Sequence, residues 1–345
     1  MSVSVLVTGG AGFIGSHTVI ALAAAGYRPV VYDNFSNSHQ SILDGLREIL
    51  GTDVPCYVAD CTDKAALFDV VEREHIQGVV HFAAFKAVGE SVQEPLRYYR
   101  NNLDALLTLL EVMLEVGVHD LIFSSSCTVY GTPDHLPVTE SSPVLPALSP
   151  YGNTKQIGEE MLRDAVTAGK PLRVISLRYF NPIGAHSSAL IGELPIGVPN
   201  NLVPYITQTA IGLRPELIVF GDDYPTPDGT CIRDYIHVMD LAEAHVSALN
   251  NLRRLGALAT HYDVFNIGTG RGASVLEVVR TFEEVSGQPL RYRIGPRRSG
   301  DVPAVYADAS KAQEHLGWTA RRTLHDALAD AWRWEQHWQK LSAQP

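Results

Sequence analysis

The chain has 345 residues, of which 46% are hydrophobic and 19% are charged. This length and composition predict a large buried core, with roughly two domains or one domain and a large appendage. The formal net charge is −11, and Lys and Arg form no marked cluster. These features argue against nucleic acid or an anionic membrane as a partner.

The cysteines indicate a reducing compartment and no metal. Cys56, Cys61, Cys127 and Cys231 show no Cys-x-x-Cys spacing, so we expect neither a metal site nor a redox pair. No apolar run approaches the ~20 residues that a membrane helix needs. The chain enters its first predicted strand without a basic and apolar leader. We therefore expect a cytoplasmic protein that makes no membrane contact.

Short apolar runs alternate with helix-forming segments along the first half of the chain. Strands are predicted over residues 3–8, 29–32, 55–59, 78–82, 121–125 and 172–177, and helices over residues 14–25, 64–74, 95–116 and 151–168. Strands that are apolar throughout are typical of a sheet buried on both faces. The fold class predicted is α/β, with a doubly wound parallel sheet of the Rossmann type.

The composition changes after Arg178, because residues 181–233 are rich in Gly, Pro and Asn. A helix over 238–252 and a strand over 264–267 are predicted to return to the sheet. A helix, a strand, a loop and a Trp-rich helix follow from residue 268. We expect one domain from residues 1–180 plus 234–267, and a smaller substrate lobe from residues 181–233 plus 268–345.

Three glycines follow the first predicted strand and open the first helix. Gly9 permits a tight turn, Gly12 permits close approach to a pyrophosphate, and Gly15 permits packing of helix on strand. Asp33 ends the second strand, where a carboxylate binds ribose hydroxyls and repels a 2′-phosphate. The pattern favours NAD over NADP as the cofactor; the competing interpretations are a chance loop and a surface acid.

Tyr151 and Lys155 lie one helical turn apart on one predicted helix face. A phenol has a pKa near ~10, and a nearby ammonium should lower it toward the range of a useful base. Ser126 ends a strand at the carboxyl edge of the sheet, where its hydroxyl can hold a reacting oxygen. An ordinary amphipathic Tyr/Lys pair is the alternative, and the glycine turn and Ser126 argue against it.

Five further segments carry a family resemblance. They are His81–Ser91 (HFAAFKAVGES), Phe123–Gly131 (FSSSCTVYG), Arg178–Pro182 (RYFNP), Pro199–Leu202 (PNNL) and Asp228–Val238 (DGTCIRDYIHV). With the two motifs above, they make the chain similar to the extended short-chain dehydrogenase/reductase family. Within that family it resembles the UDP-glucose (UDP-galactose) 4-epimerases over nearly its whole length. The resemblance implies NAD-dependent inversion at carbon 4 of a UDP-hexose through a transient 4-keto sugar.

The resemblance also implies residue roles. Tyr151 would be the catalytic base, Ser126 its partner on the sugar hydroxyl, and Lys155 a ligand of the nicotinamide ribose. Besides Tyr151 and Lys155, the NAD-binding residues would be Gly9, Gly12, Phe13, Ile14, Gly15, Asp33, Asn34, Asn37, Ser38, Asp60, Cys61, Phe82, Ala83, Lys86, Asn101 and Phe180. The UDP-sugar, besides Ser126 and Tyr151, would contact Asn181, Asn200, Asn201, Leu202, Phe220, Arg233, Arg298, Asp301 and Val305. No metal is implied.

Val305 bears on the choice of sugar. Relatives restricted to UDP-glucose and UDP-galactose resemble one another in having a tyrosine there, and those that accept N-acetylated sugars have a smaller residue. We therefore expect UDP-N-acetylglucosamine and UDP-N-acetylgalactosamine as further substrates. The alternative is that Val305 only packs in the core and Tyr306 fills the space.

The same motifs are compatible with three different functions. A nucleotide-sugar 4,6-dehydratase would need an acid/base pair, for which similar enzymes carry Asp-Glu where this chain has Cys127-Thr128. A net sugar dehydrogenase or reductase would exchange its cofactor, and a non-catalytic protein would only bind NAD. The helices over 95–116 and 151–168 resemble those that form the four-helix interface of related homodimers, so we expect a homodimer.

Overall fold

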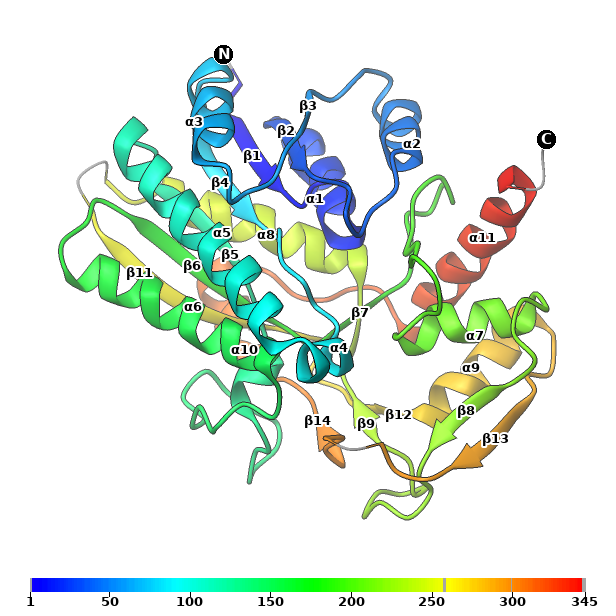
Figure 1. Ribbon diagram of the computed structural model, residues 1–345. Coiled ribbons are helices and arrows are strands. Elements are labelled where there is room, and N and C mark those ends of the chain that lie inside the picture. Colours follow the sequence, from blue (N-terminus) through cyan, green and yellow to red (C-terminus); the bar gives the residue numbers. More distant parts are fainter. Residues whose placement is uncertain (1, 257–258, 299, 343–345) are drawn as a thin grey trace.

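A seven-stranded parallel sheet forms the centre of the computed structural model, which describes residues 2–256, 259–298 and 300–342. Within these ranges the strand order is β11-β6-β5-β4-β1-β2-β3. The strands are β1 (Ser4–Thr8), β2 (Arg28–Asp33), β3 (Cys56–Val58), β4 (Ile76–His81), β5 (Asp120–Ser126), β6 (Arg173–Tyr179) and β11 (His261–Ile267). Figure 1 shows helices on both faces of this sheet. The predicted α/β fold with a doubly wound parallel sheet is confirmed.

Successive side chains of each strand enter two different cores. Val5 and Val7 of β1 pack in a cluster with residues of α1 and α8, whereas Leu6 between them packs in a cluster with residues of α3, α5 and α6. Side chains alternate between the two faces of a strand, so a strand covered on both faces is apolar at every position. This is why the continuous apolar runs in the sequence predict the sheet.

The helices differ in how far the sequence predicts them. They are α1 (Phe13–Ala24), α2 (Ser41–Leu50), α3 (Lys64–Arg73), α4 (Val88–Gln93), α5 (Pro95–Val116), the 3₁₀ helix η1 (Cys127–Tyr130), α6 (Pro150–Thr167), α7 (Leu202–Ala210), α8 (Val238–Arg253), α9 (Val275–Ser286), α10 (Ser310–Leu316) and α11 (Leu324–Ser342). The predicted helices over 14–25, 64–74, 95–116, 151–168 and 238–252 are present. Helices α2, α4, η1, α7 and α10 lie in segments for which no helix is predicted from the sequence.

The order of the strands creates a switch point between β1 and β4. From β1 the chain adds β2 and β3 on one side, and then crosses to add β4, β5 and β6 on the other. The loops that leave the carboxyl ends of β1 and β4 therefore diverge. Ligands of open α/β sheets bind at such a point. Gly9 and Phe82, the candidate residues that follow these two strands, both lie there.

The remaining segments form three small sheets and a separate core. β7 (Asn181–Ile183) pairs with β10 (Tyr235–His237), β9 (Ile232–Arg233) lies between β12 (Ala273–Ser274) and β14 (Ala304–Val305), and β8 (Leu217–Phe220) pairs with β13 (Tyr292–Gly295). Side chains of α7, α9 and α11 form the core against them. Figure 1 shows this part beside the carboxyl edge of the large sheet. No helix in the described part of the chain has both the length and the apolar character to cross a bilayer.

Candidate active site

The glycine turn after β1 is a tight cradle at the start of α1. Gly9 has a φ of 69°, and a Cβ atom on it would lie 2.9 Å from the backbone nitrogen of Ala83. A Cβ atom on Gly15 would lie 2.2 Å from the Gly9 carbonyl oxygen. Any side chain at either position would push apart the turn, the helix and the loop after β4. The two glycines therefore let backbone approach backbone at the switch point.

The N-terminus of α1 is open toward the space beside this turn. Gly12 is the N-cap residue and has no side chain to cap the helix. A Cβ atom there would approach only the Gly9 carbonyl oxygen, at 3.1 Å, so the rest of its surroundings are free. Phe13 and Ile14 form the first turn, which contains no acidic residue. An uncapped helix N-terminus with this opening fits the pyrophosphate of a dinucleotide.

The Asp33 carboxylate is held in place at the end of β2. Its Oδ2 accepts a hydrogen bond from the Ala11 backbone nitrogen at 3.0 Å. Its Oδ1 accepts bonds from the Phe35 backbone nitrogen at 2.8 Å and from the Ser38 hydroxyl at 2.9 Å. The carboxylate is therefore attached to the glycine turn on one side and to the loop after β2 on the other. A ribose bound there would meet a rigid, negatively charged acceptor.

Polar side chains continue from Asp33 toward β3. The Asn34 amide donates to the Asp60 carboxylate at 2.8 Å. Burial raises the pKa of Asp60, but bonds from Thr62 and Asn34 outweigh burial and hold that pKa below its ordinary value. Cys61 is buried beside Asp60, and Asn37 is exposed on the loop. This part of the site suits an adenosine, which presents hydroxyl and amino groups.

The other candidate cofactor residues lie on the far side of the switch point. The Phe82 ring lies 4.8 Å from the His245 ring, and Ala83 is adjacent to Gly9. Lys86 lies in the loop between β4 and α4, Asn101 on α5, and Phe180 is buried after β6. With the glycine turn and Asp33, most of these residues follow the carboxyl ends of strands of the large sheet. The residues present therefore fit an NAD molecule.

Tyr151 and Lys155 lie on the first two turns of α6, next to the end of β5. Pro150 opens the helix, and the Ser149 hydroxyl caps it by accepting from the Gly152 backbone nitrogen at 3.2 Å. The Lys155 ammonium donates to the Ser124 carbonyl oxygen at 2.6 Å and lies 5.9 Å from the centre of the Tyr151 ring. Strand β5 and helix α6 thus bring the serine run, the phenol and the ammonium together.

The electrostatics of this group differ from the expectation that Lys155 lowers the pKa of the phenol. Burial raises the pKa of Tyr151 to about 12, and hydrogen bonding with Ser126 opposes that rise. Burial also lowers the pKa of Lys155 to about 8, against the attraction of Glu159. The ammonium is bonded to the Ser124 carbonyl, and Lys155 is not among the groups that shift the pKa of the phenol. The chain's own residues therefore raise the pKa of the phenol, through desolvation.

A buried charge network supports α6 from behind. Arg178 of β6 donates to both oxygens of Glu159, at 2.9 and 2.6 Å, and to the Tyr130 hydroxyl at 2.9 Å. The Ser125 hydroxyl donates to the same carboxylate at 2.5 Å. Glu159 follows Lys155 by one more helical turn. The four-residue spacing of Tyr151, Lys155 and Glu159 puts all three on one helix face, and this spacing is the sequence signal that points to Glu159. Sequence reasoning missed Glu159 because its partner, Arg178, lies on another element.

Two candidate arginines that lie outside the large sheet, Arg233 and Arg298, share the carboxylate of Asp301. Asp301 Oδ1 accepts from Arg298 Nη2 at 2.8 Å and lies 3.5 Å from Arg233 Nη2. The Arg298 guanidinium lies 5.7 Å from the centre of the Phe220 ring, which is 40% exposed. Two guanidinium groups fixed by one acid, next to an exposed aromatic ring, can bind a diphosphate and a base.

The remaining candidate residues lie on three elements. Asn181 begins β7, and Val305 on β14 is buried in a cluster with Phe180 and Tyr130. The segment that opens α7 holds Asn200, Asn201 and Leu202. Among the described residues, no three His, Cys, Asp or Glu side chains come together as metal ligands.

The sheet, the glycine turn at its switch point and the Ser-Tyr-Lys group define a dinucleotide-binding protein of the extended short-chain dehydrogenase/reductase class. The family model described as GDP-mannose 4,6 dehydratase matches residues 6–331. The UDP-glucose 4-epimerases of Bacillus subtilis (strain 168) and Mus musculus are 52% and 51% identical to the chain, over 96% of each chain. The chain therefore belongs to the family of UDP-glucose 4-epimerases, and the resemblance described from the sequence is confirmed.

Solved structures agree with this assignment. The UDP-glucose-4-epimerase of Stenotrophomonas maltophila, with bound NAD and formylated UDP-arabinopyranose, superposes with a TM-score of 0.95 at 47% identity, covering 98% of this chain and 99% of that one. The UDP-glucose 4-epimerase of Bifidobacterium longum, in complex with NAD⁺ and UDP, has a TM-score of 0.93 at 48% identity, covering 97% and 98%.

Proposed function

We propose that this protein is an NAD-dependent enzyme that inverts carbon 4 of UDP-hexoses, interconverting UDP-glucose and UDP-galactose. The observation that carries the proposal is the meeting of Ser126, Tyr151 and Lys155 at the carboxyl edge of the sheet. A glycine turn suited to a dinucleotide and a pair of arginines suited to a diphosphate support the proposal. The hydrogen on carbon 4 is not acidic, so inversion has to pass through a flat, transient 4-keto sugar.

Each residue has one task in this reaction. Tyr151 takes the proton of the carbon-4 hydroxyl and later returns it, and Ser126 holds that hydroxyl toward the phenol. Lys155 binds the nicotinamide ribose and contributes positive charge beside α6. When bound, NAD takes a hydride from carbon 4 and gives it back. The burial that raises the pKa of Tyr151 also excludes water from this proton transfer.

The substrate has to be held firmly at its nucleotide and loosely at its hexose, so that the flat sugar can present its other face. Arg233 and Arg298 bind the diphosphate, and the exposed Phe220 ring lies near the uracil. Asp301 supports this division because it fixes both guanidinium groups. Asn181, Asn200, Asn201 and Leu202 complete the binding surface around the sugar nucleotide.

One incubation distinguishes the proposal from the three competing functions. The protein is incubated with UDP-galactose, without added NAD, and the products are separated while cofactor absorbance is followed. Epimerisation yields UDP-glucose with no net change in the cofactor. A product lighter by one water would indicate a 4,6-dehydratase, net reduction of the cofactor a dehydrogenase, and no product a binding protein. Cys127 and Thr128 in η1 support the epimerase, because neither supplies the carboxylate that dehydration needs.

The fixed carboxylate of Asp33 leads to a prediction about cofactor choice. Protein stripped of cofactor should bind NAD more than about tenfold tighter than NADP, because the 2′-phosphate would lie against that negative charge. Isothermal calorimetry with both dinucleotides measures the ratio. Equal affinities would mean that Asp33 does not face the ribose.

We further propose that UDP-N-acetylglucosamine and UDP-N-acetylgalactosamine are substrates. The valine at position 305 supports this, because its side chain is smaller than a tyrosine and carries no aromatic ring; it is 6% exposed. It lies in the cluster that contains Phe180 and Tyr130, so a larger side chain would have to displace one of these rings or enter the sugar site.

Val305→Tyr should therefore abolish epimerisation of the N-acetylated pair and retain that of UDP-galactose. The reason is steric: the added ring takes the space that an acetamido group at carbon 2 would occupy. Turnover of the four UDP-sugars is compared in the wild type and the variant, with Val305→Ala as the matched control that adds no volume. A wild-type protein active on UDP-galactose but inactive on both N-acetylated sugars would contradict the proposal.

Three further features belong to the same proposal. We infer that residues 1–180 plus 234–267 bind NAD and that residues 181–233 plus 268–345 bind the UDP-sugar; residues 1, 257–258, 299 and 343–345 lie outside the described residues. We infer a homodimer formed through α5 and α6, which the exposed Leu96 and Leu107 of α5 support. The four unpaired cysteines, all in described ranges, support a cytoplasmic location.

A further inference from the structure

Glu193 lies between the two parts of the candidate site, although neither motif nor spacing marks it in the sequence. Its side chain is 11% exposed. Its Oε1 accepts a hydrogen bond from Asn201 Nδ2 at 2.5 Å and lies 3.8 Å from the Lys86 ammonium. Lys86 belongs to the loop after β4, and Asn201 to the segment that opens α7. One carboxylate oxygen thus contacts the cofactor side and the sugar-nucleotide side of the proposed site.

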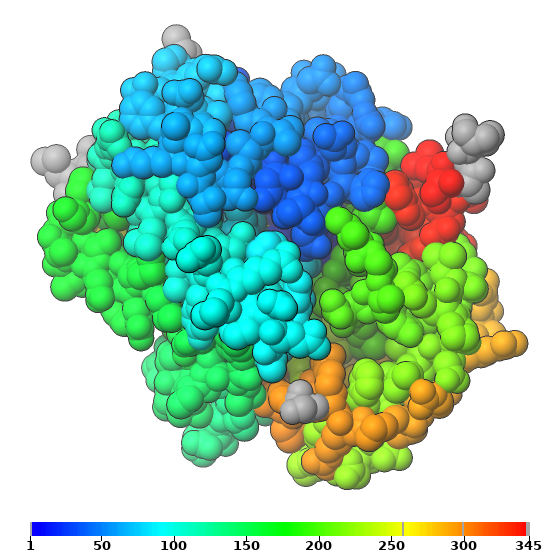
Figure 2. Space-filling view, viewed as in Figure 1, coloured from blue at the N-terminus to red at the C-terminus, as the bar shows by residue number. Residues whose placement is uncertain are grey.

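The surfaces of these two segments meet on the outside of the molecule. In Figure 2 the cyan surface around α4 abuts the bright green surface of the segment that follows β7. Lys86 lies just before α4, and Glu193 lies in the segment between β7 and α7. The contact therefore joins segments that are far apart in the sequence. An ion pair and a hydrogen bond on one carboxylate can hold both segments at a defined separation.

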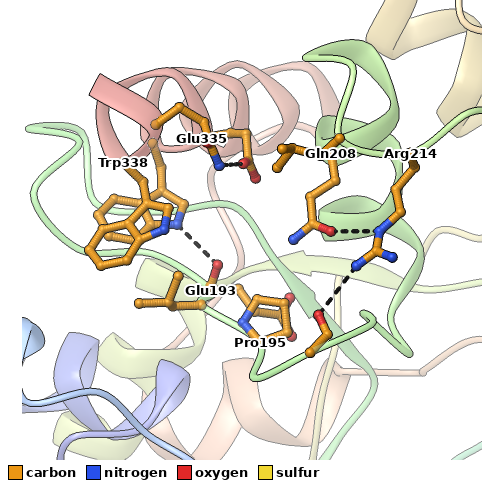
Figure 3. A pocket seen from close by; sticks show the side chains of 11 residues that line it. Glu193, Pro195, Gln208, Arg214, Glu335 and Trp338 are labelled. Carbon is orange, nitrogen blue, oxygen red and sulfur yellow. Dashed lines mark hydrogen bonds between the residues drawn. The ribbon is translucent and has the colours of Figure 1, made fainter. Parts of the chain in front are cut away.

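The backbone of Glu193 is anchored from the opposite side by α11. The Trp334 indole nitrogen donates to the Glu193 carbonyl oxygen at 3.0 Å (Figure 3). A Cβ atom on Gly192 would lie 2.4 Å from the Trp334 ring, so this glycine lets the segment pack flat on the indole. Glu193 and Trp334 border a cavity of about 330 Å³ that Glu335 also lines. The Glu193 side chain thus projects from a fixed point.

The contact with Glu193 also determines what the Asn201 side chain does. Asn201 is the N-cap residue of α7, yet its side chain makes no capping hydrogen bond. An asparagine at this position ordinarily accepts a bond from the first turn of the helix. Here its amide is turned toward Glu193 instead. Burial raises the pKa of the Glu193 carboxyl, and Lys86 and Asn201 oppose that rise by favouring the charged form.

We propose that Glu193 is a positioning residue, which holds Lys86 and Asn201 in the arrangement that binds the UDP-sugar against the cofactor. This inference rests on the proposed function, because it takes Lys86 and Asn201 as parts of the two binding surfaces. Without the carboxylate, the Asn201 amide can swing to the end of α7, and the loop that carries Lys86 is no longer attached to the segment after β7. Substrate affinity should suffer first, since the carboxylate touches no reacting atom.

Two variants separate the contacts of Glu193. Glu193→Gln keeps an oxygen that can accept from Asn201 but removes the charge opposite Lys86, and Glu193→Ala removes both. Glu193→Ala should raise KM for UDP-galactose and Kd for UDP about tenfold, with a smaller change in kcat, because bonds to charged groups are the stronger ones. Glu193→Gln should recover part of this loss. The measurements are steady-state kinetics and calorimetry on the NAD-loaded protein.

Glu335 supplies the matched control. It is also a buried glutamate on the wall of the cavity, and its carboxylate accepts from Thr207 at 3.0 Å and from Gln339 at 2.9 Å. Glu335→Ala should leave KM and the UDP affinity near those of the wild type. An equal loss of UDP affinity in Glu335→Ala would mean that the effect comes from packing around the cavity, and the proposal would be wrong.

A double variant tests whether Glu193 acts through Lys86. Lys86→Met and Glu193→Gln should each weaken UDP binding, and the double variant should be no weaker than the worse single variant. Fully additive losses, or an unchanged Kd in Glu193→Ala, would overturn the proposal. UDP affinity reports on Asn201 whether or not the protein turns over a sugar. A wild type that binds UDP but converts no UDP-galactose would therefore refute the proposed function alone.

Discussion

Tyr151→Phe should lower the turnover of UDP-galactose by about 10²–10⁴-fold, while the fold and the bound NAD are retained. Phenylalanine keeps the ring that packs at the start of α6 and removes the oxygen that we propose accepts the carbon-4 proton. The measurement is kcat on purified protein, with NAD content and circular dichroism recorded for each variant.

Tyr99→Phe is the matched control for this experiment. The hydroxyl of Tyr99, on α5, accepts a hydrogen bond at 2.7 Å from Asn153, which lies on α6 with Tyr151. Its removal perturbs α6 without touching the reacting group, so turnover should stay within a few-fold of the wild type. Comparable activity in Tyr151→Phe and Tyr99→Phe would show that the proton acceptor is another residue.

Glu159→Gln should lower the free energy of unfolding by about 3–5 kcal/mol, because it leaves the buried Arg178 guanidinium without its counter-charge. The side chains of Arg178 and Glu159 are 6% and 7% exposed, so water cannot replace the lost carboxylate. Glutamine has nearly the same shape, which excludes a cavity as the cause. The midpoint and slope of urea unfolding, measured with and without NAD, give the change.

The next residue in the chain provides the comparison for Glu159→Gln. Glu160 is exposed on the same helix turn, and Glu160→Gln should change stability by no more than about 0.5 kcal/mol. If both variants unfold at the same urea concentration, the ion pair with Arg178 is not a main support of α6. If Glu159→Gln loses activity at temperatures where it is still folded, the ion pair of Glu159 with Arg178 also positions Lys155.

Most of the doubly wound sheet can be predicted because its signal is local. Each strand is a short apolar run that is covered on both faces, and most of the predicted helices carry their own periodicity; α1 is the exception, because every residue from Gly15 to Leu22 is buried. Helix α4 escaped prediction because it spans only Val88–Gln93, too short for a periodic pattern. Helix α2 is followed by Gly51, which has a φ of 69°. The Gly and Ser residues in and around this helix form no pattern from which a helix would be predicted.

Some features of the candidate site can likewise be predicted from the sequence, and others cannot. Gly9, Gly15 and Asp33 are readable from sequence because a turn, a close packing contact and the end of a strand each demand one residue type at one place. Whether the pKa of Tyr151 is raised or lowered cannot be predicted from the sequence. It depends on how deeply the phenol is buried and on the direction of the Lys155 side chain. That direction is set by a hydrogen bond to the Ser124 carbonyl, which belongs to another element.

The parallel sheet, the turn after its first strand and the family of the chain can be predicted from apolar runs and short motifs, because these signals are local. The partners of the buried charges cannot, because they come from elements that meet only in the folded chain. Arg178 meets Glu159, and Glu193 meets both Lys86 and Asn201, across elements that are distant in the chain. The energy of a buried charge depends on what lies within a few ångströms of it, and strand order and loop packing set those neighbours.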